Sequence, residues 1–137
     1  MGFLIDTGIW IAVERGQLAV ADVHSITKSA PVFISPVTIA ELRLGLELMS
    51  DHNQRLKALA ALRRLKRKPT LRMDLETGEL FGSLAARLAK SGRGYEFRVQ
   101  DLWLAASALQ RHFKFLTQNE KDFKDIPGLD LVVMKRN

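Results

Sequence analysis

The sequence predicts an α/β domain in which helices cover a parallel β-sheet. Short, unbroken apolar runs such as Phe3–Ile5 and Val32–Ile34 are typical of strands that are buried on both faces of such a sheet. Segments with helical periodicity lie between these runs, and this alternation favours a parallel sheet with right-handed crossovers. The 137 residues fit one domain, because no repeat, linker or low-complexity segment divides them.

Two short helices are expected between the first and second strands. The apolar segment Ile9–Val13 follows the first strand and stops before Gly16, a residue type that breaks helical patterns. Residues 18–28 form a weaker helical pattern, which ends before Pro31. The chain then returns to the sheet at Val32.

Two longer helices are expected after the second strand. Ser35 followed by Pro36 is typical of an N-cap and a first helical position, and this helix runs to about Met49. Asp51 is the expected N-cap of the next helix, over residues 52–68. The predicted buried stripe of that second helix consists of leucines: Leu56, Leu59, Leu62 and Leu65.

The second half of the chain repeats the alternation. Residues 71–73 predict a weak third strand, and Asp74 is the expected N-cap of a helix that stops near Gly92. An apolar helix is expected over residues 102–112, with Asp101 at its start. The remaining elements are a strand over residues 114–117, a short helix over 120–124 and a strand over 131–134. The sheet therefore has about five expected strands.

The charge of the chain favours a polyanionic partner. A net charge of +6 and a pI near 10.0 bias a small domain toward nucleic acid, although the same charge also serves plain solubility. The absence of cysteine excludes disulfides and thiolate metal sites. No apolar run approaches the ~20 residues that cross a membrane, and the first strand leaves no room for a signal peptide. We therefore expect a cytoplasmic protein without membrane contact.

Asp6 is the first acidic residue that stands out. It follows the first strand directly, and sites in open α/β sheets form outside the carboxyl ends of strands. Asp6 is therefore a candidate ligand or catalyst. The alternative is a helix N-cap, because Asp and Thr are both residue types that cap helices well.

Glu41 lies on a helix whose apolar residues surround it. At 100° per residue, Val37, Ala40, Leu44 and Leu48 lie around one direction, and Glu41 falls within that sector. Burial of an unpaired carboxylate at this position costs on the order of several kcal/mol. Glu41 is therefore expected either to pair with an arginine or to bind a metal.

Two further acids follow apolar segments. Asp101 precedes a helix that is apolar nearly all round, where it gains from the helix dipole and is either a cap or part of an acidic cluster. Asp122 follows the fourth strand, with Phe123 expected to fix the turn. The Asp122 side chain is expected to point toward Asp6, and the alternative is ordinary loop polarity.

Acids that converge without cysteine or histidine form a hard oxygen site. Such donors suit Mg²⁺ or Mn²⁺. These ions polarise a phosphoryl oxygen and generate hydroxide from bound water. A basic protein with an acidic metal pocket therefore indicates phosphodiester hydrolysis.

Four motifs in the chain, taken together, resemble the PIN-domain nucleases, in particular the VapC-like toxins of toxin–antitoxin pairs and the related FitB proteins. The resemblance covers essentially the whole chain and rests on the order and separation of the motifs. They are Phe-Leu-Ile-Asp-Thr at residues 3–7 and the segments 35–45, 101–109 and 116–123.

The resemblance implies a PIN-like three-layer α/β/α domain over residues 1–137. It also implies that Asp6, Glu41 and Asp101 are ligands of Mg²⁺ or Mn²⁺ in an endoribonuclease, with homodimerisation and a cognate antitoxin that inhibits it. Two positions depart from the family pattern. Gly8 stands where the family usually has Asn or Ser, and Asn119 stands where many members carry a fourth acid, so Asp122 is the charged candidate for the fourth ligand.

Other polar residues are expected to contact the RNA substrate. Thr7 or Thr117 is expected to orient water or ligands, with Asn119 nearby. Arg93 and Arg98 precede Asp101 and suit phosphates near the metal. A further basic cluster at the end of the helix over residues 52–68 either binds RNA or is a solvated helix end: Arg63, Arg64, Lys66, Arg67 and Lys68.

We therefore expect a metal-dependent endoribonuclease toxin that hydrolyses RNA. The alternative is a catalytically weak PIN-fold module that binds RNA or a partner without cutting, which the departures at Gly8 and Asn119 keep open. A receiver-type phosphoacceptor is disfavoured, because such domains typically need paired acids after the first strand, whereas Thr7 follows Asp6.

Overall fold

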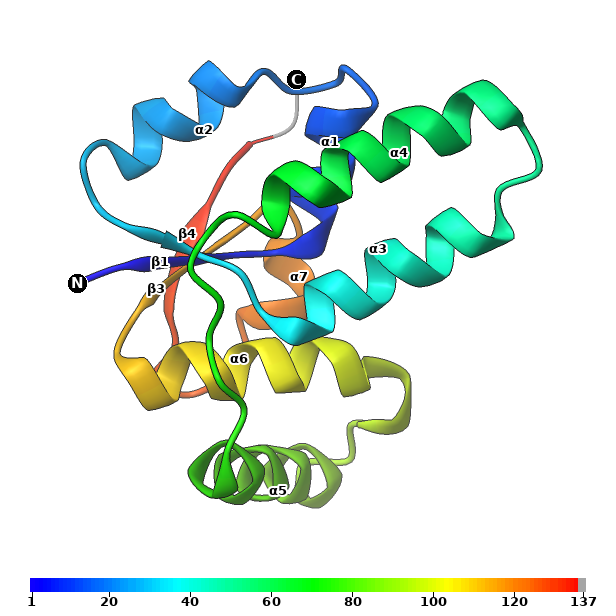
Figure 1. Cartoon of the computed structure of the whole chain (residues 1–137). Coiled ribbons are helices and arrows are strands. Elements are labelled where there is room, and N and C mark those ends of the chain that lie inside the picture. The colour runs from blue at the N-terminus through cyan, green and yellow to red at the C-terminus, as the bar shows by residue number, and fades with distance from the viewer. Residues whose placement is uncertain (136–137) are drawn as a thin grey trace.

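A parallel sheet of four strands forms the centre of the computed structural model (Figure 1). The structure describes residues 1–135, with the side chain of Phe97 excepted. The strands are β1 (Phe3–Ile5), β2 (Val32–Phe33), β3 (Lys114–Thr117) and β4 (Asp130–Val133), in the order β2-β1-β3-β4. The helices are α1 (Thr7–Glu14), α2 (Val20–Thr27), α3 (Pro36–Leu48), α4 (His52–Leu65), α5 (Leu75–Lys90), η1 (Glu96–Arg98), α6 (Val99–Arg111) and α7 (Glu120–Phe123).

Helices cover both faces of this sheet, because both faces carry apolar side chains. Leu4 and Phe115 are fully buried on one face, against α5, α6 and α7. Ile5 and Leu116 are fully buried on the other face, against α1, α2 and the end of α4. The predicted three-layer α/β/α architecture with a parallel sheet is thereby confirmed (Figure 1).

The strand expected over residues 71–73 is reduced to a single bridge. Ile34 pairs with Thr70, and Leu71 donates a backbone hydrogen bond to the Ile34 carbonyl. Pro69 has no N–H to extend this pairing, and Asp74 already caps the next helix. Four strands therefore form in the described part of the chain, in place of about five.

The N-caps expected before three of the helices form as predicted. The side chains of Ser35, Asp51 and Asp74 accept hydrogen bonds from backbone N–H groups two or three residues further on. These caps set the starts of α3, α4 and α5. No helix among residues 1–135 is long and apolar enough to span a membrane.

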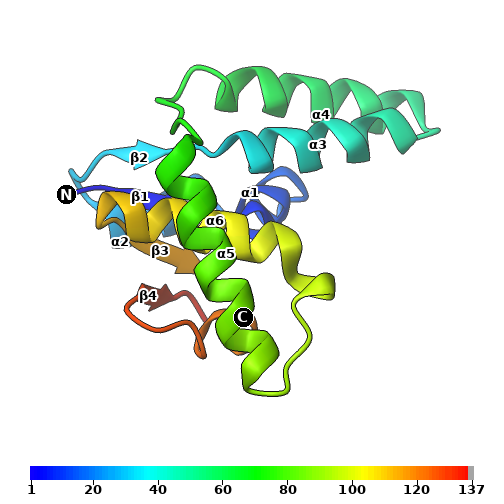
Figure 2. The same cartoon turned by 90° about the horizontal axis from the view of Figure 1, so that it is seen from below.

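The helices α3 and α4 form a hairpin that extends beyond the sheet (Figures 1 and 2). A small separate core holds the two helices together through Leu46, Ala58 and Leu62. Arg55 adds polar contacts, because its Nη1 donates to the carbonyls of Leu46 at 2.9 Å and Met49 at 3.2 Å, near the end of α3.

The apolar stripe expected for α3 does not match its buried side, whereas the stripe expected for α4 is buried or half-buried except at Leu56. Leu44, Leu48 and Leu56 are 62%, 76% and 53% exposed. The buried side of α3 instead contains Thr38 and Leu46, because it is set by packing against α1 and α4. The helical periodicity of α3 therefore predicts the helix correctly but not the direction of its buried side.

The separate core predicts that two leucines on one helix respond differently to truncation. Leu62→Ala should lower the free energy of unfolding by about 2–5 kcal/mol, because it leaves a cavity between α3 and α4. Leu56→Ala is the matched control and should change it by less than about 0.5 kcal/mol. Urea unfolding of both variants measures the difference, and equal losses would contradict the described packing.

Candidate active site

The four acids singled out from the sequence lie on segments that meet at the carboxyl end of the parallel strands. Asp6 follows β1, and Asp122 lies on α7, directly after the neighbouring strand β3. Glu41 lies on α3 and Asp101 lies in the first turn of α6. Figure 1 shows the starts of α1 and α6, together with α3 and α7, at this same end of the sheet. A parallel sheet brings these distant segments together, because the carboxyl ends of all its strands lie on the same side.

Asp6 occupies the N-cap position of α1, but its carboxylate is held from the other strand. The Thr117 hydroxyl donates to Asp6 Oδ2 at 2.7 Å, and no capping hydrogen bond of regular geometry forms. Burial raises the pKa of Asp6, while the Thr117 hydroxyl and the nearby N–H groups of Gly8 and Thr7 lower it. The net pKa lies above the ordinary value. Asp6 therefore stands at the N-cap position of α1 and is in addition bound by Thr117 from the neighbouring strand.

Glu41 is held by a short relay of hydroxyl groups. Thr7 donates to Glu41 Oε1 at 2.9 Å, and its oxygen lies 2.9 Å from the Thr38 hydroxyl. Since Thr7 has one hydroxyl proton, Thr38 is the donor of the second bond. The pKa of Glu41 is raised, first by burial and then by the charge of Asp6. Glu41 makes no ion pair with an arginine in the described part of the chain, so that alternative is wrong.

Asp101 lies inside α6 and does not cap it. The helix begins at Val99, and the N-cap residue Arg98 makes no side-chain cap, so the expected start at residue 102 is wrong. Burial raises the pKa of Asp101 to about 6, with further contributions from the charges of Asp6 and Asp122. Arg98 acts in the opposite direction.

Asp122 is placed by the residue that follows it. Phe123 is 1% exposed, and its ring packs on Phe115 at a centroid distance of 4.6 Å, as expected for a residue that fixes the turn. Asp122 lies near enough to Asp6 and Asp101 to raise the pKa of both. The reading of Asp122 as ordinary loop polarity is thereby disfavoured.

The donor set fits a hard divalent cation in chemical type and charge. The four side chains offer only carboxylate oxygens, and burial, followed by negative neighbours, raises the pKa values of Asp6, Glu41 and Asp101. Within residues 1–135, however, no three acidic or histidine side chains are gathered closely enough to form a ready metal site. The acids are thus brought to one place without being drawn into one coordination sphere.

The two departures from the family pattern differ in their surroundings. A Cβ atom at Gly8 would meet no atom within 4 Å, so the space for a serine or asparagine side chain is open. Asn119 precedes α7, and its backbone N–H donates to the Thr117 hydroxyl at 2.9 Å. Thr117 therefore links Asn119 to Asp6.

The two arginines expected near phosphates both contact Asp125. Arg93 Nη1 lies 2.7 Å from Asp125 Oδ2, and Arg98 Nη1 lies 2.9 Å from the same oxygen. Asp125 was not predicted from the sequence, because nothing in the sequence pairs it with residues about 30 positions earlier. Of the two arginines, Arg98 is the one that also contacts the acidic site, through the Asp122 carbonyl.

The profile of the PIN domain family matches residues 3–129. Ribonuclease VapC of Rickettsia bellii (strain RML369-C) is 30% identical over 135 residues, which cover 98% of this chain and 97% of that protein. Ribonuclease VapC5 of Mycobacterium tuberculosis (strain ATCC 25618 / H37Rv) is 34% identical over 125 residues, covering 91% of this chain and 87% of that protein.

Solved structures share this fold. The VapBC-5 structure from Mycobacterium tuberculosis, a member of the VapBC family of toxin–antitoxin systems, matches with a TM-score of 0.75 and 31% identity, over 98% of each chain. VapBC2 from Rickettsia felis, solved bound to a promoter DNA fragment, matches with a TM-score of 0.83 and 23% identity, over 98% of this chain and 100% of that one. This second likeness concerns the fold alone.

The raised pKa of Asp101 predicts that Asp101→Asn stabilises the metal-free protein at neutral pH. The folded state holds the proton up to a pH of about 6, whereas the unfolded state releases it near 3.8, so ionisation lowers stability as the pH rises through this window. Asparagine has no charge to bury. The variant should therefore melt higher than the wild type near pH 7, and the difference should vanish near pH 4.

Melting curves in EDTA at several pH values measure this effect. Asp130→Asn is the matched control, because Asp130 is exposed on β4, and it should change the melting temperature little. A variant Asp101→Asn that is less stable than the wild type at neutral pH would show that the charge of Asp101 is favourably paired.

Proposed function

Because this chain belongs to the PIN domain family, we propose that it is an endoribonuclease toxin of a toxin–antitoxin pair that hydrolyses RNA at an acidic Mg²⁺ or Mn²⁺ site. The observation that carries the proposal is the position of four acids near the carboxyl ends of β1 and β3: Asp6 directly after β1, and Glu41, Asp101 and Asp122 on α3, α6 and α7. The relatives named ribonuclease VapC support the reaction class.

The cation would be held by Asp6, Glu41 and Asp101, with Asp122 as the fourth carboxylate. When bound, Mg²⁺ or Mn²⁺ supplies Lewis-acid chemistry, because it polarises a phosphoryl oxygen and lowers the pKa of bound water. The site also needs to release any proton held by Asp101, whose pKa is about 6 in the metal-free protein. Cation affinity should therefore fall when the pH drops below this value.

Hydroxyl groups orient the proposed ligands. Thr117 fixes Asp6 Oδ2, and Thr7 fixes Glu41 Oε1, so one oxygen of each carboxylate has a set position before a ligand arrives. A hydroxyl donor does this without neutralising the carboxylate. Thr7 and Thr117 thus act as positioning residues, a narrower role than the substrate contact expected from the sequence.

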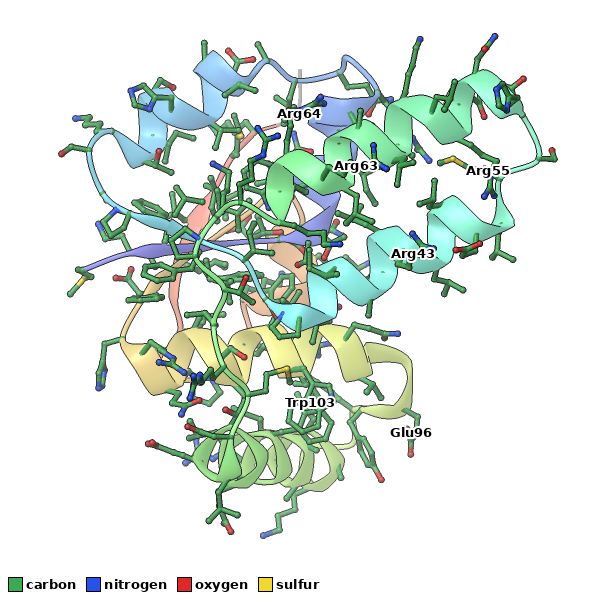
Figure 3. All side chains as sticks on the ribbon, viewed as in Figure 1. Arg43, Arg55, Arg63, Arg64, Glu96 and Trp103 are labelled. Carbon is green, nitrogen blue, oxygen red and sulfur yellow. The ribbon has the colours of Figure 1, made fainter. Side chains whose placement is uncertain are left out.

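The α3–α4 hairpin carries arginine side chains, whose positive charge suits an RNA backbone (Figure 3). Arg43 pairs with Glu47 at 2.6 Å, and Arg55 binds carbonyls of α3. Arg63 and Arg64 are exposed near the end of α4 and make no ion pair with a described residue. We infer that this pair contacts RNA phosphates, and the solvated helix end remains the alternative that a salt titration of RNA binding distinguishes.

A cognate antitoxin and a second copy of the chain are the proposed protein partners. The structural relatives from VapBC toxin–antitoxin systems support the first. The exposed Leu44 and Leu48 on α3 suit a protein interface of either kind, since contiguous exposed apolar side chains mark such surfaces. A toxin of this kind acts on cellular RNA, so we also infer a cytoplasmic location.

Cleavage should require the acids together. Asp6→Asn, Glu41→Gln and Asp101→Asn should each lower Mn²⁺-dependent RNA cleavage by about a hundredfold or more, because each removes one charge from a shared cation site. Asp130→Asn is the control, and EDTA should abolish wild-type cleavage. Full activity in one of the three variants would remove that residue from the mechanism. RNA binding without cleavage in Mn²⁺ would favour the non-cutting module.

Expression without a partner should arrest bacterial growth. The arrest should be relieved by co-expression of the cognate antitoxin, and a soluble Asp6→Asn variant should not cause it, because that variant lacks one proposed ligand. Growth curves with protein levels checked by immunoblot measure this. Normal growth at verified soluble expression of the wild type would count against the toxin role.

A further inference from the structure

The turn that carries Asp122 has little stability of its own. The helix α7 consists of four residues, Glu120–Phe123, and one isolated turn does not form unaided in water. Packing of Phe123 on Phe115 fixes one side of this turn. Asp122, the preceding residue, needs a second point of attachment to keep its place near Asp101.

Arg98 provides that attachment. Its Nη2 donates to the backbone carbonyl of Asp122, at the end of α7. The same guanidinium binds both carboxylate oxygens of Asp125, with Nη1 2.9 Å from Oδ2 and Nη2 3.0 Å from Oδ1. The two side chains are only 16% and 14% exposed, so water screens this paired geometry weakly.

The position of Arg98 in the chain connects this contact to the other side of the site. Arg98 is the N-cap residue of α6, and Asp101 lies three residues later in the first turn. One guanidinium therefore joins the start of the helix that carries Asp101 to the turn that carries Asp122. Because its fork is occupied by Asp125, a phosphate would have to displace that carboxylate to bind Arg98 in the same way.

We propose that Arg98 and Asp125 are positioning residues, whose ion pair ties α7 to the start of α6 and so holds Asp122 beside Asp101. The proposal rests on the proposed nuclease function, in which Asp122 completes the acidic site. It replaces the expected role of Arg98 as a phosphate contact.

Hydrogen exchange on the full chain tests the attachment directly. The backbone N–H groups of Asp122 and Lys124 are hydrogen-bonded to Asn119 and Glu120 at 3.1 and 2.9 Å, so their exchange reports on α7. Arg98→Lys keeps the charge but loses the fork, and Asp125→Asn keeps the shape but loses the charge. Both should speed exchange at these two amides by about tenfold or more.

Arg43→Ala is the matched control, because Arg43 belongs to an exposed ion pair with Glu47 and should leave α7 exchange unchanged. Exchange in Arg98→Lys that is as slow as in the wild type would overturn the proposal. If Arg98→Lys fails to fold, the same result in Asp125→Asn would overturn it. These readouts need no RNA, so an inactive wild-type protein would contradict the proposed function and leave this test intact.

Steady-state kinetics separate positioning from substrate contact. Loss of positioning should lower kcat with KM nearly unchanged in Asp125→Asn, because the RNA contacts stay in place. A phosphate contact by Arg98 would instead raise KM and make RNA binding less salt-dependent in Arg98→Lys, with normal exchange in α7. That second pattern would overturn the proposal.

Discussion

Burial of several carboxylates near one another, at the carboxyl end of the sheet, is the constraint to which the rest of the site responds. The sheet topology brings Asp6 and Asp122 to neighbouring strand ends, and α3 and α6 add Glu41 and Asp101. Burial makes each charge harder to hold, as the pKa of Asp101, about 6, shows. This corresponds to at most about 3 kcal/mol at neutral pH, and to less here because the side chain is half-buried and partly screened by water.

The partners of these acids explain how the charge is kept. Asp6 and Glu41 receive hydrogen bonds from threonine hydroxyls, which fix an oxygen and leave the negative charge in place. An arginine in the same positions would cancel that charge and compete with a cation. The arginine that lies closest to the site, Arg98, is instead bound to Asp125, outside the four acids. The distribution of donors thus leaves the four acids without a paired cation among the described residues, within a chain of net charge +6.

The sequence predicted the acids of the site better than the packing and the ion pair that hold their segments. Asp6 and Asp122 could be found because they follow buried strands, and strand ends meet in a parallel sheet. The buried side of α3 could not be predicted, because the exposed Leu44 and Leu48 outweigh the buried Thr38 in any apolar pattern. The Arg98–Asp125 pair also left no local signal, since it joins residues that only the folded chain brings together.

The four acids differ in what holds their segments in place. Asp6 follows directly from β1, whereas Glu41 lies on a hairpin that has its own small core and extends beyond the sheet. Glu41 is joined to α1 through Thr38 and Thr7, so this hydroxyl relay couples the hairpin to the strand end. A cation held by these acids would therefore join the end of β1, through Asp6, to the hairpin, through Glu41.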